Sequence, residues 1–245
     1  MILVIGGAGY IGSHVVKELI SQHHRVVVLD NLSTGNRMSV NKRAVFEKGD
    51  FLNPDDLDRV FSRYSIEAVM HFAIYNVAEM VVLFRKMLIY QIKNFILSSE
   101  LPFFGMPYKD REIYKQYPSV FQGNSSLVVE QVLEDFYKTY DLHHISLRYY
   151  NAVGTDVEEG SSIDYQPETY LLPRMLLHLQ NQEEQPFLVN CNCDTPDGMI
   201  VRGYVHVMDV ARAHVLALHS LLEGSNKTNQ LYHLSNESSC SVIED

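Results

Sequence analysis

The order of apolar and polar positions predicts strands and helices in alternation along most of the chain. Short, continuous apolar runs are typical of strands buried on both faces of a sheet. Such runs are ILVI (2–5), RVVVLD (25–30), AVFEKGD (44–50), AVMHFA (68–73), KNFILSS (93–99), HISLRYY (144–150), FLVNC (187–191) and QLYHLS (230–235). Strands that alternate with helices predict parallel pairing, so we expect an α/β fold with a doubly wound parallel sheet.

Helices are predicted where apolar residues recur at every third or fourth position. The segments with this pattern are 13–21, 53–64, 126–140 and 209–224. Asn53 and Pro54 suit the N-cap and the first position of the second helix. No helix is predicted in the short segment between the strands at 68–73 and 93–99, and a sheet face left uncovered there would weaken the fold.

Three glycines, Gly6, Gly9 and Gly12, join the first predicted strand to the first predicted helix. This spacing allows a tight turn, a close approach of the backbone to a pyrophosphate, and close packing of helix on strand. Asp30 ends the second strand, where a carboxylate can accept from both ribose hydroxyls and would repel a 2′-phosphate. The pattern favours NAD over NADP; the alternative is a set of turn glycines with Asp30 as an ordinary strand end.

Composition excludes several classes of protein. A net charge of −10 does not suit a nucleic-acid binder, which needs clustered lysine and arginine. No run approaches the ~20 apolar residues of a membrane span, and the first strand begins at the first methionine, so we expect neither a membrane segment nor a signal peptide. The chain has 3 cysteines, too few for a disulfide framework. We therefore expect a cytoplasmic protein.

Six segments of the chain resemble the extended short-chain dehydrogenases/reductases, and within them the UDP-glucose 4-epimerases. They stand in the order found in that family: GGAGYIGSH (6–14), LDNLSTG (29–35), GD (49–50), HFA (71–73), RYYNAVG (148–154) and VRGYVHVMD (201–209). The resemblance implies a Rossmann-like NAD-binding domain over 1–151. It also implies a small, incomplete substrate lobe over 152–245, interleaved with the last elements of the Rossmann sheet. It further implies NAD as cofactor, UDP-glucose or UDP-galactose as the nucleotide sugar, and a homodimer.

The same resemblance assigns candidate site residues. Those expected at the NAD site are Gly6, Gly9, Tyr10, Ile11, Gly12, Asp30, Asn31, Asp50, Phe51, Phe72, Ala73 and Tyr150. Asn151 is expected near the sugar. Arg202 is expected at the UDP phosphates, since its planar fork matches phosphate oxygens; a solvated surface arginine is the alternative.

The chain departs from the family at the reacting centre. Members of the family use a tyrosine in a Tyr-x-x-x-Lys pair as the base and a serine or threonine that hydrogen-bonds the sugar. Alignment to the helix LVVEQVLEDF (127–136) puts Gln122 at the tyrosine position and Ser126 at the lysine position. Alignment of the strand-end segment SSELPFFG (98–105), counted back from its glycine, puts Pro102 at the serine or threonine position. None of the three can take over the role, so no catalytic residue is assigned. Two interpretations stay open: a binding protein with impaired or absent epimerase activity, and an active epimerase with another base.

Other candidate motifs have ordinary explanations. Cys191 and Cys193 lack a second ligand pair at zinc spacing, and the histidine pairs at 23–24 and 143–144 precede strands, where turn or surface roles dominate. No metal site is therefore predicted.

Overall fold

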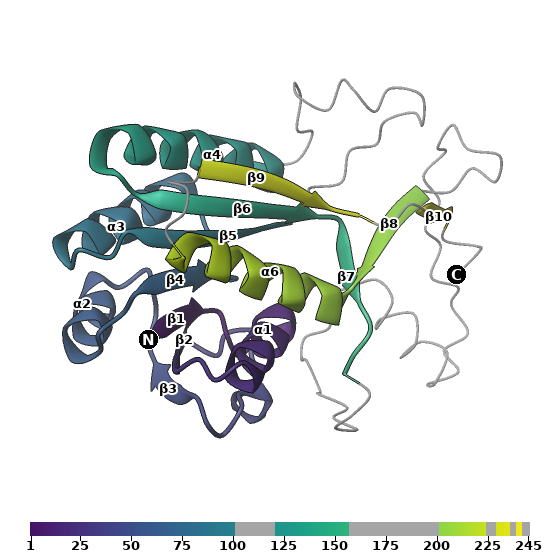
Figure 1. Cartoon of the computed structure of the whole chain (residues 1–245), viewed down its shortest axis with the longest axis horizontal. Helices are drawn as coiled ribbons and strands as arrows, with labels where there is room; N and C mark the ends of the chain where they lie inside the picture. The colour runs from purple at the N-terminus through teal and green to yellow at the C-terminus, as the bar shows by residue number, and fades with distance from the viewer. Residues whose placement is uncertain (101–120, 157–200, 224–228, 236–238, 242–245) are drawn as a thin grey trace.

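The computed structural model describes residues 1–100, 121–156, 201–223, 229–235 and 239–241 (Figure 1). Its strands are β1 (Ile2–Ile5), β2 (Val26–Asp30), β3 (Val45–Lys48), β4 (Ala68–His71), β5 (Asn94–Glu100), β6 (His143–Tyr149), β7 (Asn151–Val153), β8 (Val201–His206), β9 (Asn229–Leu234) and β10 (Ser239–Ser241). Its helices are α1 (Tyr10–Ser21), α2 (Pro54–Arg63), α3 (Val77–Ile89), α4 (Phe121–Tyr140) and α6 (Val207–Leu222), with a 3₁₀ turn, η1 (Arg37–Ser39).

Seven strands form one sheet in the order β3-β2-β1-β4-β5-β6-β9, and every neighbouring pair is parallel. The chain builds outward from β1 to β3, returns to the other side of β1, and continues outward from β4. The strand order therefore reverses between β1 and β4, and ligands of open α/β sheets bind at the carboxyl ends of the strands at such a point. The predicted doubly wound parallel sheet is confirmed.

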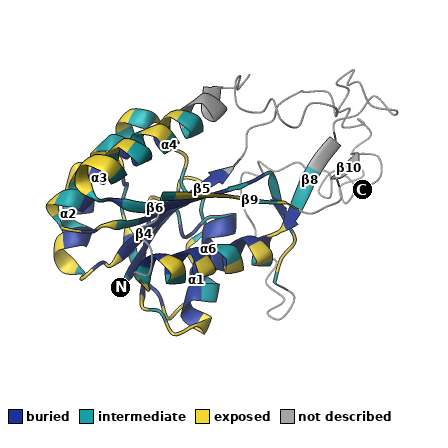
Figure 2. Ribbon diagram, turned by 45° about the horizontal axis from the view of Figure 1, so that its top comes forward, coloured by how far each residue is buried: buried dark blue, intermediate teal, exposed yellow. Residues whose placement is uncertain are grey.

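The helices cover both faces of this sheet (Figures 1 and 2). α1 and α6 pack together on one face, where Val15, Leu19, Val215 and Leu218 are fully or almost fully buried. α2, α3 and α4 cover the other face and have their own buried cluster. The strands contribute apolar residues to both clusters, which explains why they read as unbroken apolar runs.

Helix α3 corrects the expectation that the segment between β4 and β5 has no helix. Asn76 accepts a hydrogen bond from the backbone N–H of Glu79 at 3.1 Å, and the Glu79 carboxylate accepts from the backbone N–H of Asn76 at 2.7 Å. This reciprocal cap starts a 13-residue helix that buries Met80, Phe84 and Met87 against the sheet. This sheet face is covered, so the expected exposure was wrong.

The other predicted helices are confirmed, with shifted boundaries. The Asn53 side chain caps α2 by accepting from the backbone N–H of Asp55 at 3.1 Å. The helices predicted from residues 13, 126 and 209 begin earlier, at Tyr10, Phe121 and Val207. Helix ends are the least certain part of a sequence pattern because capping is local.

A second, smaller sheet was not predicted. β8 pairs in parallel with β7 and antiparallel with β10. The predicted strand at 187–191 and the cysteines Cys191 and Cys193 lie outside the described residues. The domain boundary at 151/152 stays a prediction.

Candidate functional site

The glycine turn between β1 and α1 leaves no room for side chains. Gly6 has a φ of 76°, in the left-handed region, and a Cβ there would lie 2.8 Å from the backbone nitrogen of Ala73. A Cβ on Gly12 would lie 2.3 Å from the carbonyl oxygen of Gly6. Glycine is therefore required at both positions by the packing of the turn against β4 and against the helix.

The first turn of α1 lies at the carboxyl end of the sheet, next to the glycine turn. Gly9 is the N-cap residue and supplies no side-chain cap. The first backbone N–H groups of a helix have no partner within the helix, and together with the helix dipole they attract anions. The Tyr10 hydroxyl donates to the carbonyl oxygen of Gly154 at 2.5 Å, which connects this turn to the loop after β7.

Asp30 is buried and held in one orientation. Its Oδ2 accepts from the backbone N–H of Ala8 at 2.9 Å, and its Oδ1 accepts from that of Leu32 at 2.8 Å. Beside it, the Asn31 amide donates to the Asp50 carboxylate at 3.0 Å. The structure therefore brings Asp30, Asn31 and Asp50 together at the carboxyl ends of β2 and β3, next to the glycine turn.

Four apolar or small candidates lie around β4 and α1. Ile11 and Phe51 are buried in the two core clusters, while Phe72 and Ala73 are half-buried. Phe72 donates its backbone N–H to the carbonyl oxygen of Ile5 at 2.9 Å, which carries the β1–β4 pairing to the edge of the sheet. These residues fix the shape of the carboxyl edge around the turn.

His71, at the end of β4, is fully buried. Neither ring nitrogen has a hydrogen-bond partner among the described residues. Phe51, Tyr75 and Phe95 surround the ring with centroids at 4.7, 5.4 and 6.5 Å. Burial lowers its pKa to about 3, so the imidazole is neutral and acts as part of the core.

A polar cluster lies beyond the end of β4. Among the described side chains, no lysine belongs to it. The Tyr75 hydroxyl donates to Ser126 Oγ at 3.3 Å, and Ser99 Oγ donates to Glu130 Oε1 at the same distance. Arg148 donates to Glu130 through two nitrogens, one of them at 2.9 Å. Ser126 is the residue at the predicted lysine position, and it faces a phenol.

The electrostatics of this cluster keep Tyr75 protonated. Burial, followed by the negative charge of Glu130, raises the pKa of Tyr75, and its hydrogen bonds to Ser126 and Ser99 offset this only in part. A phenol acts as a base at neutral pH only when its pKa is lowered. Tyr75 therefore lies near the predicted reacting centre in the wrong protonation state for a base.

Tyr75 is the residue that the sequence analysis missed. It lies just past the carboxyl end of β4, where ligands of such sheets gather, and that position was the available signal. Gln122 lies in α4, one helical turn before Ser126. Pro102 lies outside the described residues.

The candidates toward the sugar side lie on β7 and β8 and in the residue before β7. Tyr150 is half-buried, and its ring lies 3.1 Å from where a Cβ on Gly203 would be. The Asn151 amide donates to the carbonyl oxygen of Gly203 at 3.4 Å. Arg202 lies in β8 in register with Cys240 of β10. The backbone thus gathers Tyr150, Asn151 and Arg202 around the small sheet.

Comparison with known proteins decides the family. The model of the NAD-dependent epimerase/dehydratase family matches residues 2–230. The chain belongs to this family. The resemblance drawn from the sequence motifs is confirmed.

Within the NAD-dependent epimerase/dehydratase family, similar proteins include several UDP-glucose 4-epimerases. The enzyme of Lacticaseibacillus casei is 35% identical over 246 residues, which cover 93% of this chain and 74% of that protein. The crystal structure of UDP-glucose 4-epimerase from Brucella ovis in complex with NAD matches with a TM-score of 0.89 at 33% identity, over 99% of this chain and 79% of that one. The Bifidobacterium longum enzyme, in complex with NAD⁺ and UDP, matches with a TM-score of 0.84 at 27% identity, over 99% and 80%.

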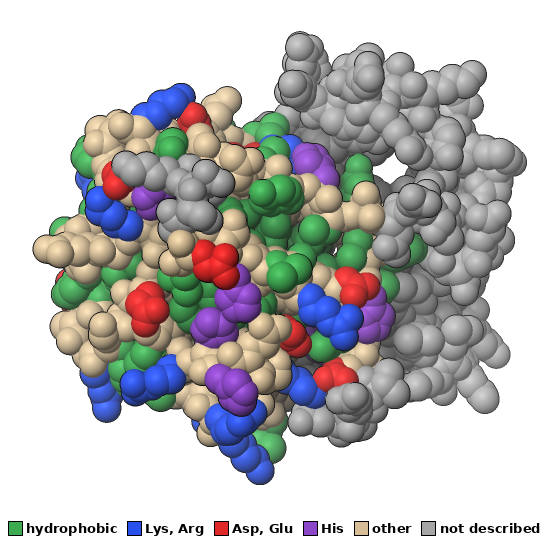
Figure 3. All heavy atoms as spheres, in the orientation of Figure 1, with side chains coloured by type: hydrophobic (Ala, Val, Ile, Leu, Met, Phe, Trp, Pro, Cys, Tyr) green, Lys and Arg blue, Asp and Glu red, His purple; other side chains and the backbone are tan. Residues whose placement is uncertain are grey.

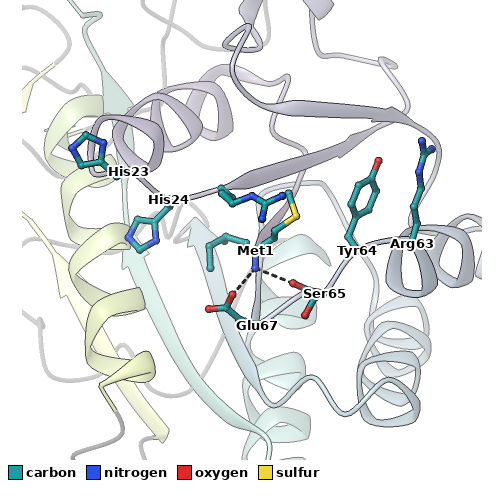
Figure 4. A pocket seen from close by; sticks show the side chains of 9 residues that line it. Met1, His23, His24, Arg63, Tyr64, Ser65 and Glu67 are labelled. Atoms are coloured by element: carbon teal, nitrogen blue, oxygen red, sulfur yellow. Dashed lines mark hydrogen bonds and ion pairs between the residues drawn. The ribbon is translucent and has the colours of Figure 1, made fainter.

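A pocket of about 470 Å³ lies at the opposite edge of the sheet, where the strands begin (Figure 4). Its lining includes Met1, His24, Arg63 and Glu67. The N-terminal amine donates to the Ser65 carbonyl at 2.9 Å and to Glu67 Oε1 at 2.6 Å. This pocket is separate from the glycine turn.

No described helix has the length and hydropathy that crossing a bilayer would require.

Proposed function

We propose that this protein binds NAD and a UDP-sugar but has impaired or absent 4-epimerase activity. The observation that carries the proposal is the contrast at the carboxyl edge of the sheet. The glycine turn keeps the geometry a dinucleotide needs, whereas Ser126, at the lysine position, faces a protonated phenol and no ammonium group among the described residues.

The residues present fit NAD. Gly6 and Gly12 let the turn pack closely against β4 and α1, and a Cβ on Gly9 would meet only the Gly6 carbonyl oxygen, at 3.3 Å. The start of α1 at Gly9, which has no side-chain cap, can offer backbone donors to a pyrophosphate. The Asp30 carboxylate, held by the N–H groups of Ala8 and Leu32, is placed to accept from a ribose. When bound, NAD supplies a hydride acceptor, while these side chains bind and orient it.

The remaining candidates complete the proposed site. The NAD site would be shaped by Tyr10, Ile11, Asn31, Asp50, Phe51, Phe72, Ala73 and Tyr150. Asn151 and Arg202 would bind the nucleotide sugar. The support is their position around the turn and the small sheet, together with relatives crystallised with NAD and UDP.

Proton handling is where the proposal departs from the family's reaction. A base for the sugar hydroxyl needs a lowered pKa, which a neighbouring ammonium group provides. Here the nearest described ionised partner of the Tyr75–Ser126 pair is Glu130, whose negative charge raises the pKa of Tyr75. Sugar and cofactor could therefore bind without proton transfer.

Two measurements test the proposal separately. Titration calorimetry with NAD is expected to show saturable binding that Asp30→Asn weakens; absence of binding by the folded wild-type protein would overturn the binding claim. Conversion of UDP-galactose to UDP-glucose is expected to stay at background, with the Lacticaseibacillus casei enzyme as positive control. Turnover above background would overturn the claim that activity is absent, and turnover as fast as that of the Lacticaseibacillus casei enzyme would overturn the claim of impairment.

A matched gain-of-function variant sharpens the second measurement. Gln122→Tyr with Ser126→Lys restores the Tyr-x-x-x-Lys spacing on α4. If the missing pair is what impairs the reaction, this variant should turn over UDP-galactose faster than wild type, and Gln122→Tyr alone should not.

The alternative function is an active epimerase with another base. The position of Tyr75 beside Ser126 favours it, and the raised pKa of Tyr75 opposes it. Should wild type prove active, Tyr75→Phe distinguishes the sources of activity: loss of turnover identifies Tyr75 as the base, and full activity excludes it.

We also propose that the protein pairs through α3 and α4. These helices pack side by side and expose Val82, Ile89, Val128 and Tyr140, which are 38–70% accessible. Light scattering after size exclusion should give twice the chain mass of 28.1 kDa, and Ile89→Glu should return it to one.

A further inference from the structure

Two histidines from distant parts of the chain meet on the face formed by α1 and α6. His24 lies in the turn after α1, and His219 lies in the last turn of α6. Their Nε2 atoms are 2.9 Å apart, and the ring centroids are 5.2 Å apart with a tilt of 37°. Figure 3 shows histidine side chains gathered on this face. The two Nε2 atoms are within hydrogen-bond distance, so in the metal-free protein one imidazole donates to the other.

The backbone on each side fixes these rings. The N–H groups of His23 and His24 donate to the carbonyl oxygens of Ile20 and Leu19 at 3.1 and 2.9 Å, which closes the turn after α1. α6 is anchored by its buried face against α1 and the sheet. The convergence of the two imidazoles therefore follows from the packing of the fold.

The separation of the nitrogens fits two neighbouring positions around one metal ion. Imidazole nitrogens bind first-row divalent ions at ~2.0–2.1 Å, so two nitrogens at a right angle lie about 3.0 Å apart and two at the tetrahedral angle about 3.4 Å apart. The observed 2.9 Å matches the right angle. Tetragonal or square arrangements of nitrogen ligands are preferred by Ni²⁺ and Cu²⁺.

We propose that His24 and His219 form a surface site for Ni²⁺ or Cu²⁺, with water at the remaining positions. Within the described part of the chain, no group of three or more histidine, cysteine, aspartate or glutamate side chains is placed to hold a metal. The protein therefore supplies two ligands. Both rings are partly exposed, so an ion reaches them from solvent.

The surrounding charges act in both directions. The negative charge of Glu67 favours a cation near His24. Two positively charged groups, Arg25 and the N-terminal amine, line the adjoining pocket and oppose it (Figure 4). Two ligands and this mixed charge predict moderate affinity.

A bound ion would join the turn after α1 to the end of α6. Because the ion binds the folded state, it should raise the melting temperature in proportion to the logarithm of its concentration. The site lies where the strands begin, away from the glycine turn, so NAD binding should be independent of it.

The test is calorimetric titration of untagged protein with Ni²⁺ alone. The expected result is a single site of moderate affinity, with binding at least about tenfold weaker in His24→Gln and in His219→Gln. The matched control is His23→Asn, next to the site; asparagine tolerates the φ of 66° at that position. This control should bind Ni²⁺ like wild type.

Equal Ni²⁺ affinity in wild type and both glutamine variants would overturn the proposal, as would an equal loss in His23→Asn. If a glutamine variant does not fold, the electron paramagnetic resonance of wild type with one equivalent of Cu²⁺ decides. Two coordinated imidazole nitrogens support the site, and one or none contradicts it.

Discussion

The two halves of the sheet's carboxyl edge differ in what surrounds them. Around β1 and β2, glycines, backbone donors and Asp30 form a rigid turn in which two positions accept no side chain. Around β5 and α4, a tyrosine, serines, and the Glu130–Arg148 pair form a polar cluster in which no lysine takes part among the described residues.

This difference teaches that binding and proton transfer make separate demands on one fold. Dinucleotide binding depends on backbone geometry, which packing of the sheet maintains. Proton transfer depends on a few side chains with matched pKa values, and substitution of these leaves the packing intact. Each half can therefore be disturbed without the other, and four experiments test this.

The largest effect is expected from Gly12→Val. Its Cβ would lie 2.3 Å from the Gly6 carbonyl oxygen, so the turn must move. We expect a loss of about 3 kcal/mol in the free energy of unfolding and at least ~100-fold weaker NAD binding. Denaturant titration and calorimetry measure the two quantities.

The control is Gly203→Ala, where the new Cβ meets only the movable Tyr150 ring at 3.1 Å. It should keep most of the stability. A Gly12→Val protein that binds NAD as wild type does would show that the turn does not form the site.

Next comes Glu130→Gln. The Glu130 and Arg148 side chains are 13% and 16% exposed, and removal of one charge leaves the other unpaired. We expect a loss of roughly 3 kcal/mol in stability with NAD affinity almost unchanged. Lys138→Gln, on the same helix but 64% exposed, should cost less than about 0.5 kcal/mol. A large loss of NAD affinity in Glu130→Gln would mean that the two halves are coupled.

Asp30→Asn should weaken NAD binding by roughly 10- to 100-fold, about 1.4–2.7 kcal/mol. The amide replaces one acceptor of the Ala8 and Leu32 N–H groups by a donor, so stability should fall by about 1–2 kcal/mol. Asp55→Asn, in the exposed first turn of α2, serves as control. Unaltered NAD affinity in Asp30→Asn would remove Asp30 from the site.

Many of these residues could be predicted from sequence, because they act through local geometry. The glycine spacing, Asp30 at a strand end and the Asn53 cap each depend on neighbours a few positions away. Tyr75 and Ser126, or His24 and His219, meet only after the sheet and helices assemble, so no local pattern shows them together. Helix α3 was missed because the segment between β4 and β5 is short. Its capping residues, Asn76 and Glu79, have the three-residue spacing of a capping box and could have predicted the helix.

The smallest effect is expected from Tyr75→Phe, and it depends on pH. Because the folded state raises the pKa of Tyr75 above its unfolded value of about 10, the folded protein holds this proton longer than the unfolded chain does. That contribution to stability is complete below pH 10 and is lost as pH rises through the folded pKa.

Wild type should therefore lose free energy of unfolding above about pH 10 more steeply than Tyr75→Phe. Below pH 9 the two should differ by at most about 1 kcal/mol, the worth of the hydrogen bond to Ser126. Tyr140→Phe, which removes an exposed hydroxyl, should behave as wild type at both ends of the range. Parallel curves for wild type and Tyr75→Phe would contradict the assignment.

The pairing of β9 with β6 has a consequence for biosynthesis. Residues 229–234 join the outer edge of a strand made of residues 143–149, so this edge stays open on the ribosome until the late segment emerges. Pairing across such a sequence distance is slow, and an open edge can recruit strands from other nascent chains. Yield of the native protein should therefore depend on translation speed and on chaperones that shield this edge.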